Sequence, residues 1–109
     1  MEDVDPMAGP LASFDITTNP DGAATVTIDG ELDLSSIDRL DAEVRRALAV
    51  SPPRLVVDVG GVRFADSSAI ALWVRWASAV PEFELRHPQP LLRRVISTMG
   101  LAGKLGVAA

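Results

Sequence analysis

The chain has 109 residues, of which 48% are hydrophobic and 23% are charged, so it is long enough for one domain with a single core. A net charge of -5 argues against nucleic-acid binding, which needs a basic face. The absence of cysteine excludes disulfides and cysteine-ligated metals, and the lone histidine, His87, argues against a zinc site of the usual kind.

The first ten residues are acidic and carry two prolines, which predicts a flexible tail over residues 1–10 ahead of a single domain over residues 11–109. This start lacks the basic and apolar regions of a signal peptide. No apolar run approaches the roughly 20 residues that a membrane-spanning helix needs. These patterns predict a cytoplasmic protein without membrane insertion.

Alternating apolar and polar residues then predict two strands, with apolar positions at Phe14, Ile16, Ala24, Val26 and Ile28. The sequence Asn-Pro-Asp-Gly between them is a strong turn signal. We therefore expect an antiparallel hairpin with one face buried and the other wet or thinly covered.

The next segment predicts a helix that begins at Ser35 or Ser36, either of which is a good N-cap, with Asp38 near a capping-box position. Apolar residues follow at helical spacing: Ile37, Leu40, Val44, Ala47 and Leu48. A pair of prolines ends this helix before the next strand.

The second half of the chain predicts strand, helix, strand and helix. Residues 55–58 form a central strand that runs into a Gly-Gly turn at residues 60–61, and residues 67–79 form the second helix. Residues 83–86 form the fourth strand, and Pro90 suits the first turn of a third helix that stops at Gly100. The order ββαβαβα predicts an α/β domain with a mixed four-stranded sheet, strands 2–4 parallel and helices packed mainly on one face.

Two tryptophans, Trp73 and Trp76, lie three residues apart in the second predicted helix. Both cannot easily face inward together with the other apolar residues of that helix. We expect at least one in the core and the other exposed and available to a partner.

Catalytic patterns are missing from the chain. A serine hydrolase needs a base beside its nucleophile, and the only histidine is His87, which we expect in an exposed loop. The G-x-S-x-G elbow is absent around Ser67 and Ser68. The Asp58–Gly61 segment resembles a GTPase D-x-x-G sequence, but no phosphate-binding loop accompanies it. We therefore expect no enzyme, and neither a cofactor nor a metal.

The most informative segment is Asp66-Ser67-Ser68-Ala69, at the predicted start of the second helix. Asp66 or Ser67 can cap the helix, and one serine suffices for that, which leaves Ser68 free. A phosphoryl group on Ser68 would meet the positive end of the helix dipole and free backbone N–H groups. Its charge of about -1.5 to -2 would change the surface presented to a partner. Helix cap and phosphorylation site both remain open from the residues alone.

Three segments resemble the STAS family, and specifically the small anti-sigma factor antagonists of bacteria. Residues 30–36 resemble the family's G-x-L-D segment entering the first helix. Residues 55–68 resemble its strand, turn and D-S-[ST] signature, and residues 91–105 resemble its terminal helix and G-L stop. The resemblance covers about residues 11 to 105, and it implies a singly wound β-α domain with strands in sequential order.

The resemblance also implies a partner switch in transcription regulation, as in stress response or sporulation. The unphosphorylated protein would bind a serine kinase of the histidine-kinase-like ATPase superfamily that doubles as an anti-sigma factor, and so free the sigma factor. That kinase would phosphorylate Ser68, and a PP2C-type phosphatase would reset it. Asp33 matches the family's aspartate near this site. The implied partner-binding residues are Asp33, Asp66, Ser67, Ser68 and Ala69.

The chain departs from the family pattern in two places. Ala69 stands where the family usually has glycine, and we expect its methyl group to narrow access to Ser68. The stretch from residue 69 to residue 83 is short for the family. The alternative function is a STAS subunit that binds another protein without phosphorylation, for example in a lipid-transport ABC complex. In either case we expect a monomer or a weak homodimer.

Overall fold

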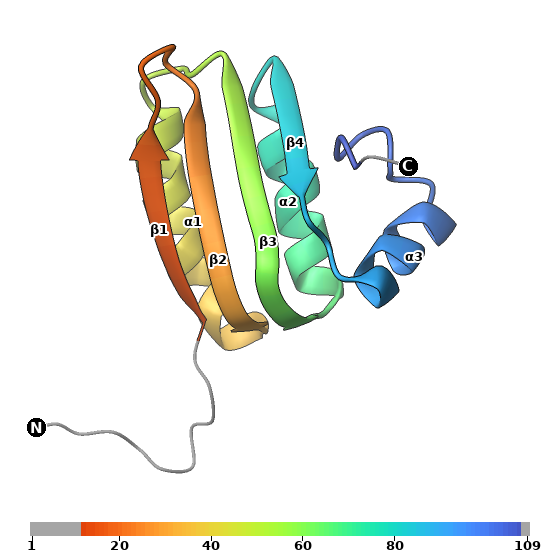
Figure 1. The fold of residues 1–109 in the computed structure, drawn as a ribbon. Helices are drawn as coiled ribbons and strands as arrows, with labels where there is room; N and C mark the ends of the chain where they lie inside the picture. Colours follow the sequence, from red (N-terminus) through yellow and green to blue (C-terminus); the bar gives the residue numbers. More distant parts are fainter. Residues whose placement is uncertain (1–11, 108–109) are drawn as a thin grey trace, which may run out of the picture.

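A computed structural model describes residues 12–107, so the tail expected over residues 1–10 lies outside the described residues. Four strands form one sheet in the order β1-β2-β3-β4 (Figure 1). The pair β1–β2 is antiparallel, and β2–β3 and β3–β4 are parallel, which confirms the expected mixed sheet and the order ββαβαβα. The elements are β1 Ser13–Thr18, β2 Ala24–Leu32, α1 Leu34–Leu48, β3 Arg54–Ala65, α2 Ser67–Ser78, β4 Glu82–Arg86 and α3 Pro90–Thr98.

Strand β3 is much longer than the sequence predicts, because it continues through Gly60 and Gly61, where we expected a turn. Strand β2 remains paired with it as far as Ala65. The register shifts by one residue opposite Ile28, so β3 carries a bulge before Gly61. A Cβ atom on Gly61 would lie 1.8 Å from Asp29 Oδ1. The glycine therefore lets two strands run side by side, and the expectation of a turn is wrong.

Helices α1 and α2 cover the same face of the sheet, while α3 lies beside β4 (Figure 1). The core between them is aliphatic and aromatic; its largest fully buried side chains include Trp73, Ile28, Leu32, Leu40, Leu55, Leu72, Leu85, Ile96 and Leu105. Sheet strands supply alternate residues and the helices supply one face each, as in other two-layer domains.

Both tryptophans of α2 are buried, Trp73 at 0% and Trp76 at 2% exposure, so the expectation of an exposed tryptophan is wrong. The reason is that α2 packs against the sheet and also against α1. Across that contact, the Trp76 indole Nε1 donates a hydrogen bond to Asp41 Oδ1 of α1 at 2.9 Å. Trp73 Nε1 lies in the core without a hydrogen-bond partner.

The outer edge of β4 is covered by the C-terminal segment. The Leu85 amide donates to the carbonyl of Leu105 at 2.8 Å, and Leu105 is fully buried. Gly106 has φ 61°, and a Cβ atom there would lie 2.3 Å from the Phe83 carbonyl oxygen. Glycine is thus required for this close approach, which shields an edge that would otherwise be free to pair.

The opposite face of the sheet is polar, as the alternation predicts, and an ion cluster centred on Glu84 lies on it. Arg86 Nε and Nη2 donate to the Glu84 carboxylate at 3.0 and 3.1 Å, and Arg54 Nη2 also bonds to it. The hydrogen bonding of Arg86, followed by the positive charges of Arg86 and Arg54, lowers the pKa of Glu84 below its usual 4.5. The Glu84 side chain is 28% exposed, so we attribute only a modest stabilisation to the cluster.

Glu84→Gln is expected to lower the free energy of unfolding at neutral pH by about 0.5–1 kcal/mol. A lowered folded-state pKa means that the ionised carboxylate stabilises the protein above pH 4.5, and that this contribution is lost as the pH falls through the folded-state value. Urea unfolding at neutral pH and at about pH 3 should therefore show a difference from wild type that shrinks in acid. Glu82→Gln, a change at an exposed carboxylate on the same strand, is the control, and an equal deficit of Glu84→Gln at both pH values would contradict the assignment.

Candidate functional site

The first turns of α1 and α2 begin side by side at one edge of the sheet. Leu32, the last residue of β2, is the register partner of Ala65, the last residue of β3. Each is followed directly by an aspartate that caps the next helix, Asp33 for α1 and Asp66 for α2. The fold therefore brings Asp33 to the Asp66–Ala69 segment, 33 positions later in the sequence. The carboxyl ends of parallel strands are where α/β sheets usually place binding sites.

Asp66 forms the N-cap of α2. Its Oδ1 atom accepts the backbone N–H groups of Ser68 at 3.0 Å and of Ala69 at 3.4 Å. The hydroxyl of Ser68 donates to the same oxygen. Of the two expected caps, Asp66 is the one observed and Ser67 makes no capping bond. Ser68, which we expected to be free, takes part in the cap, so that expectation is wrong.

Helix α1 starts in the same way, one strand away. Asp33 Oδ1 accepts the backbone N–H of Ser35 at 3.0 Å and its hydroxyl at 2.6 Å, and the Ser36 hydroxyl accepts the Asp33 N–H at 3.2 Å. The N-cap is therefore Asp33, not Ser35 or Ser36, and Ser36 rather than Asp38 completes the capping box. The Ser35 hydroxyl bond is the main cause that lowers the pKa of Asp33, so its carboxylate stays charged at neutral pH.

The candidate residues differ in how much surface they offer. Ser67 and Asp33 are exposed, and Ser68 and Asp66 are partly buried. Ala69 has 0% exposure and belongs to the hydrophobic core. Its methyl group therefore packs among the core side chains. Ala69 thus belongs to the core under the site and has no exposed surface that a partner could contact.

Among the described residues, neither Ser67 nor Ser68 is paired with a histidine. His87 Nδ1 lies 3.3 Å from Asp58 Oδ1, on the polar face of the sheet. Within residues 12–107, the side-chain partner of Ser68 is the carboxylate of Asp66. Two amides of this helix start, those of Ser68 and Ala69, already donate to Asp66 Oδ1, so they are not free as the sequence analysis expected.

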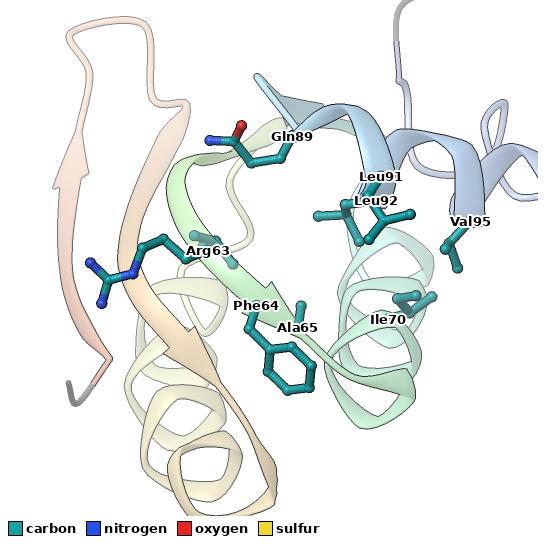
Figure 2. A pocket seen from close by; sticks show the side chains of 9 residues that line it. Arg63, Phe64, Ala65, Ile70, Gln89, Leu91, Leu92 and Val95 are labelled. Carbon is teal, nitrogen blue, oxygen red and sulfur yellow. The ribbon is translucent and has the colours of Figure 1, made fainter. Parts of the chain in front are cut away.

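An apolar pocket of about 150 Å³ lies next to the start of α2, between β3 and α3 (Figure 2). The exposed fractions of the side chains around it are high for apolar residues: 53% for Phe64, 71% for Leu91 and 39% for Val95. Ile70, two residues after Ser68, lines its floor. Sequence reasoning missed this pocket, although apolar residues at 91, 95 and 99 form an i, i+4, i+8 stripe along α3.

In the part of the chain that is described, no helix combines the length and the apolar character that crossing a membrane requires. Likewise, residues 12–107 contain no cluster of three or more histidine, cysteine, aspartate or glutamate side chains suited to hold a metal ion.

Comparison with protein families matches residues 17–107 to the family described as "Mlab, STAS domain". No curated protein sequence matches the chain. Among solved structures, an anti-sigma factor antagonist from Mycobacterium paratuberculosis superimposes with a TM-score of 0.79 at 24% identity, over 87% of this chain and 83% of the other. Unphosphorylated SpoIIAA gives a TM-score of 0.74 at 20% identity, over 84% of each chain.

The phosphorylated form of the Bacillus cell fate determinant SpoIIAA gives a TM-score of 0.70 at 20% identity, over 84% of this chain and 86% of the other. At sequence identities of 20–24%, these superpositions show similarity of fold only. The family match covers most of the chain.

Proposed function

The chain belongs to the STAS-domain family, and we propose that it is an anti-sigma factor antagonist whose binding to a kinase-type anti-sigma factor is switched off by phosphorylation of Ser68. The observation that carries the proposal is the geometry of the α2 start. There the Ser68 hydroxyl is held at a helix N-terminus by Asp66, at the edge where Asp33 also lies.

The partner surface consists of Asp33, Asp66, Ser67 and Ser68, with Ala69 beneath it. In the unphosphorylated state, a partner covers the neutral hydroxyl of Ser68 and places hydrogen-bond donors against the two carboxylates. A phosphate on Ser68 adds charge beside Asp66, and that charge would lose its water in the covered site. The complex then dissociates, and a PP2C-type phosphatase restores binding. The protein acts in the cytoplasm as a substrate and regulator.

The test is phosphorylation in vitro by a kinase-type anti-sigma factor from the same organism, with ATP and with intact-mass and peptide mass spectrometry as the readout. We expect one phosphate on the wild type, none on Ser68→Ala and one on Ser67→Ala. The Ser67 variant is a matched control because it changes the neighbouring hydroxyl, which does not take part in the cap. An unphosphorylated wild type, or a phosphate retained on Ser68→Ala, would refute the assignment.

A second candidate is a STAS subunit that binds its partner without phosphorylation, such as the ATPase of a lipid-transport ABC complex. The bond between the Ser68 hydroxyl and Asp66 is equally compatible with this candidate, because it gives Ser68 a structural role in the helix cap. In that case, Ser68→Ala weakens the complex and ATP with a kinase leaves the mass of the protein unchanged.

A further inference from the structure

Strand β3 extends well beyond its neighbour β4. The two pair only from Arg54 to Asp58, whereas β2 pairs with β3 as far as Ala65. Beyond Asp58, the Gly60 carbonyl accepts a hydrogen bond from the Gln89 side-chain amide at 2.9 Å. From Gly61 to Ala65, no strand among the described residues pairs with β3 on the β4 side. This unpaired edge is about 16 Å long, at roughly 3.3 Å per residue.

The unpaired edge forms one wall of the apolar pocket, and α3 forms the other. Figure 2 shows the Arg63 side chain pointing away from α3, so this part of the wall is the strand's backbone. Across the gap, Leu91, Leu92 and Val95 project from α3. Of these three, Leu91 and Val95 are exposed, and Leu92 is partly buried against the core. A backbone edge beside an apolar wall is the arrangement that recognises an extended peptide.

The outer edge of β4 is covered, whereas the edge of β3 from Gly61 to Ala65 is not. The free side of β4 is covered by the C-terminal segment through the Leu85–Leu105 hydrogen bond. Folded proteins shield exposed strand edges because such edges recruit other chains. Here the same sheet shields one edge and leaves a second one open beside exposed apolar side chains.

We propose that this groove, formed by Gly61–Ala65 of β3 and by Leu91, Leu92 and Val95 of α3, binds an extended segment of the protein partner. The segment adds as a short strand to β3 and places one large apolar side chain in the pocket, whose volume of about 150 Å³ is that of a cavity able to hold benzene. The inference rests on the proposed function. Ala65 and Ile70 join the groove to the Asp66–Ser68 segment, so it is the apolar continuation of the same partner surface.

The test starts with a phage-displayed library of random short peptides selected on the full-length protein, followed by NMR with the ¹⁵N-labelled chain. We expect selected peptides to share one large apolar anchor residue, to shift the amides of Gly61–Ala65 and to slow their hydrogen exchange. Leu91→Asp should lower peptide affinity at least tenfold, since Leu91 is 71% exposed and an acid is tolerated in the first turn of a helix. Val50→Asp, a change at a 78% exposed residue after the far end of α1, should leave affinity unchanged.

The proposal is overturned if the library yields no binder, if Leu91→Asp binds as well as wild type, or if the protected amides lie along β1. It is also overturned if the protein dimerises in sedimentation and Leu91→Asp abolishes the dimer, because the occupant is then a second copy of the chain. The peptide experiment uses neither kinase nor ATP. A missing phosphate on Ser68 therefore refutes the proposed function separately, without deciding the groove.

Discussion

Ser68→Asp is expected to lower the affinity for the anti-sigma partner about a hundredfold. The Ser68 side chain is partly buried already in the free protein, and its hydroxyl bonds to Asp66. A carboxylate at this position would have to lose its water under the partner and would lie beside a second carboxylate, which costs several kcal/mol. Each 1.4 kcal/mol is a factor of about ten in affinity. Isothermal titration of the variant against the unphosphorylated partner measures the loss.

Ser35→Asp is the matched control, because Ser35 makes the same pair of hydrogen bonds to Asp33 that Ser68 makes to Asp66. Both variants lose a hydroxyl from a cap, so their thermal midpoints should fall by similar small amounts, in line with about 1 kcal/mol for a cap. The loss of affinity should be much larger for Ser68→Asp. Equal losses in the two variants would mean that charge anywhere at this sheet edge disrupts binding, and a collapse of the Ser68→Asp midpoint would make Ser68 a structural residue.

Trp73→Ala is expected to lower the free energy of unfolding by about 3–5 kcal/mol. Trp73 is completely buried under α2 and has the largest volume among the fully buried side chains. Its removal leaves a cavity that the sheet and α1 can fill only in part. A domain of this size has about 5–15 kcal/mol of stability in all, so chemical denaturation followed by circular dichroism at low temperature is the suitable measurement.

The two tryptophans also allow a sharper comparison through Trp→Phe substitutions. Trp73→Phe removes an indole N–H that has no partner in the core, and an unsatisfied buried donor costs about 1–3 kcal/mol. Trp76→Phe removes the donor that bonds Asp41. We therefore expect Trp73→Phe to cost less stability than Trp76→Phe, although the Trp73 side chain is at least as buried. The opposite order would contradict the assignment of the unpaired donor.

The order and direction of the strands could be predicted from local patterns, because strands separated by helices are parallel neighbours with right-handed crossovers. The start of α1 could not be predicted as well. Serine and aspartate are both good N-caps, and three such residues lie within four positions, at 33, 35 and 36. The end of β2 decided among them, since Leu32 is the last residue that β3 can pair with, and the next residue must leave the sheet.

The length of β3 and the burial of the tryptophans depended on neighbours distant in the sequence. A Gly-Gly pair indicates a turn when taken alone, yet here it lies inside a strand because Asp29 of β2 occupies the space of a side chain. Likewise, a helix with apolar residues around much of its circumference has no obvious outer face. The position of α1 made Trp76 internal, where its indole bonds Asp41, while Trp73 lies in the core.

The sequence by itself determined the α/β class, the element order, and the segment Asp66–Ala69 as the point of interest, since these depend on periodicity and on residue types within a few positions. Tertiary structure alone decided which groups meet. The Leu32–Ala65 pairing places Asp33 beside the Asp66–Ala69 segment. The Ser68 hydroxyl bonds to the Asp66 cap, and a groove forms where β3 extends beyond the end of β4. Strand length and helix position are set by packing between distant segments, and no local pattern encodes them.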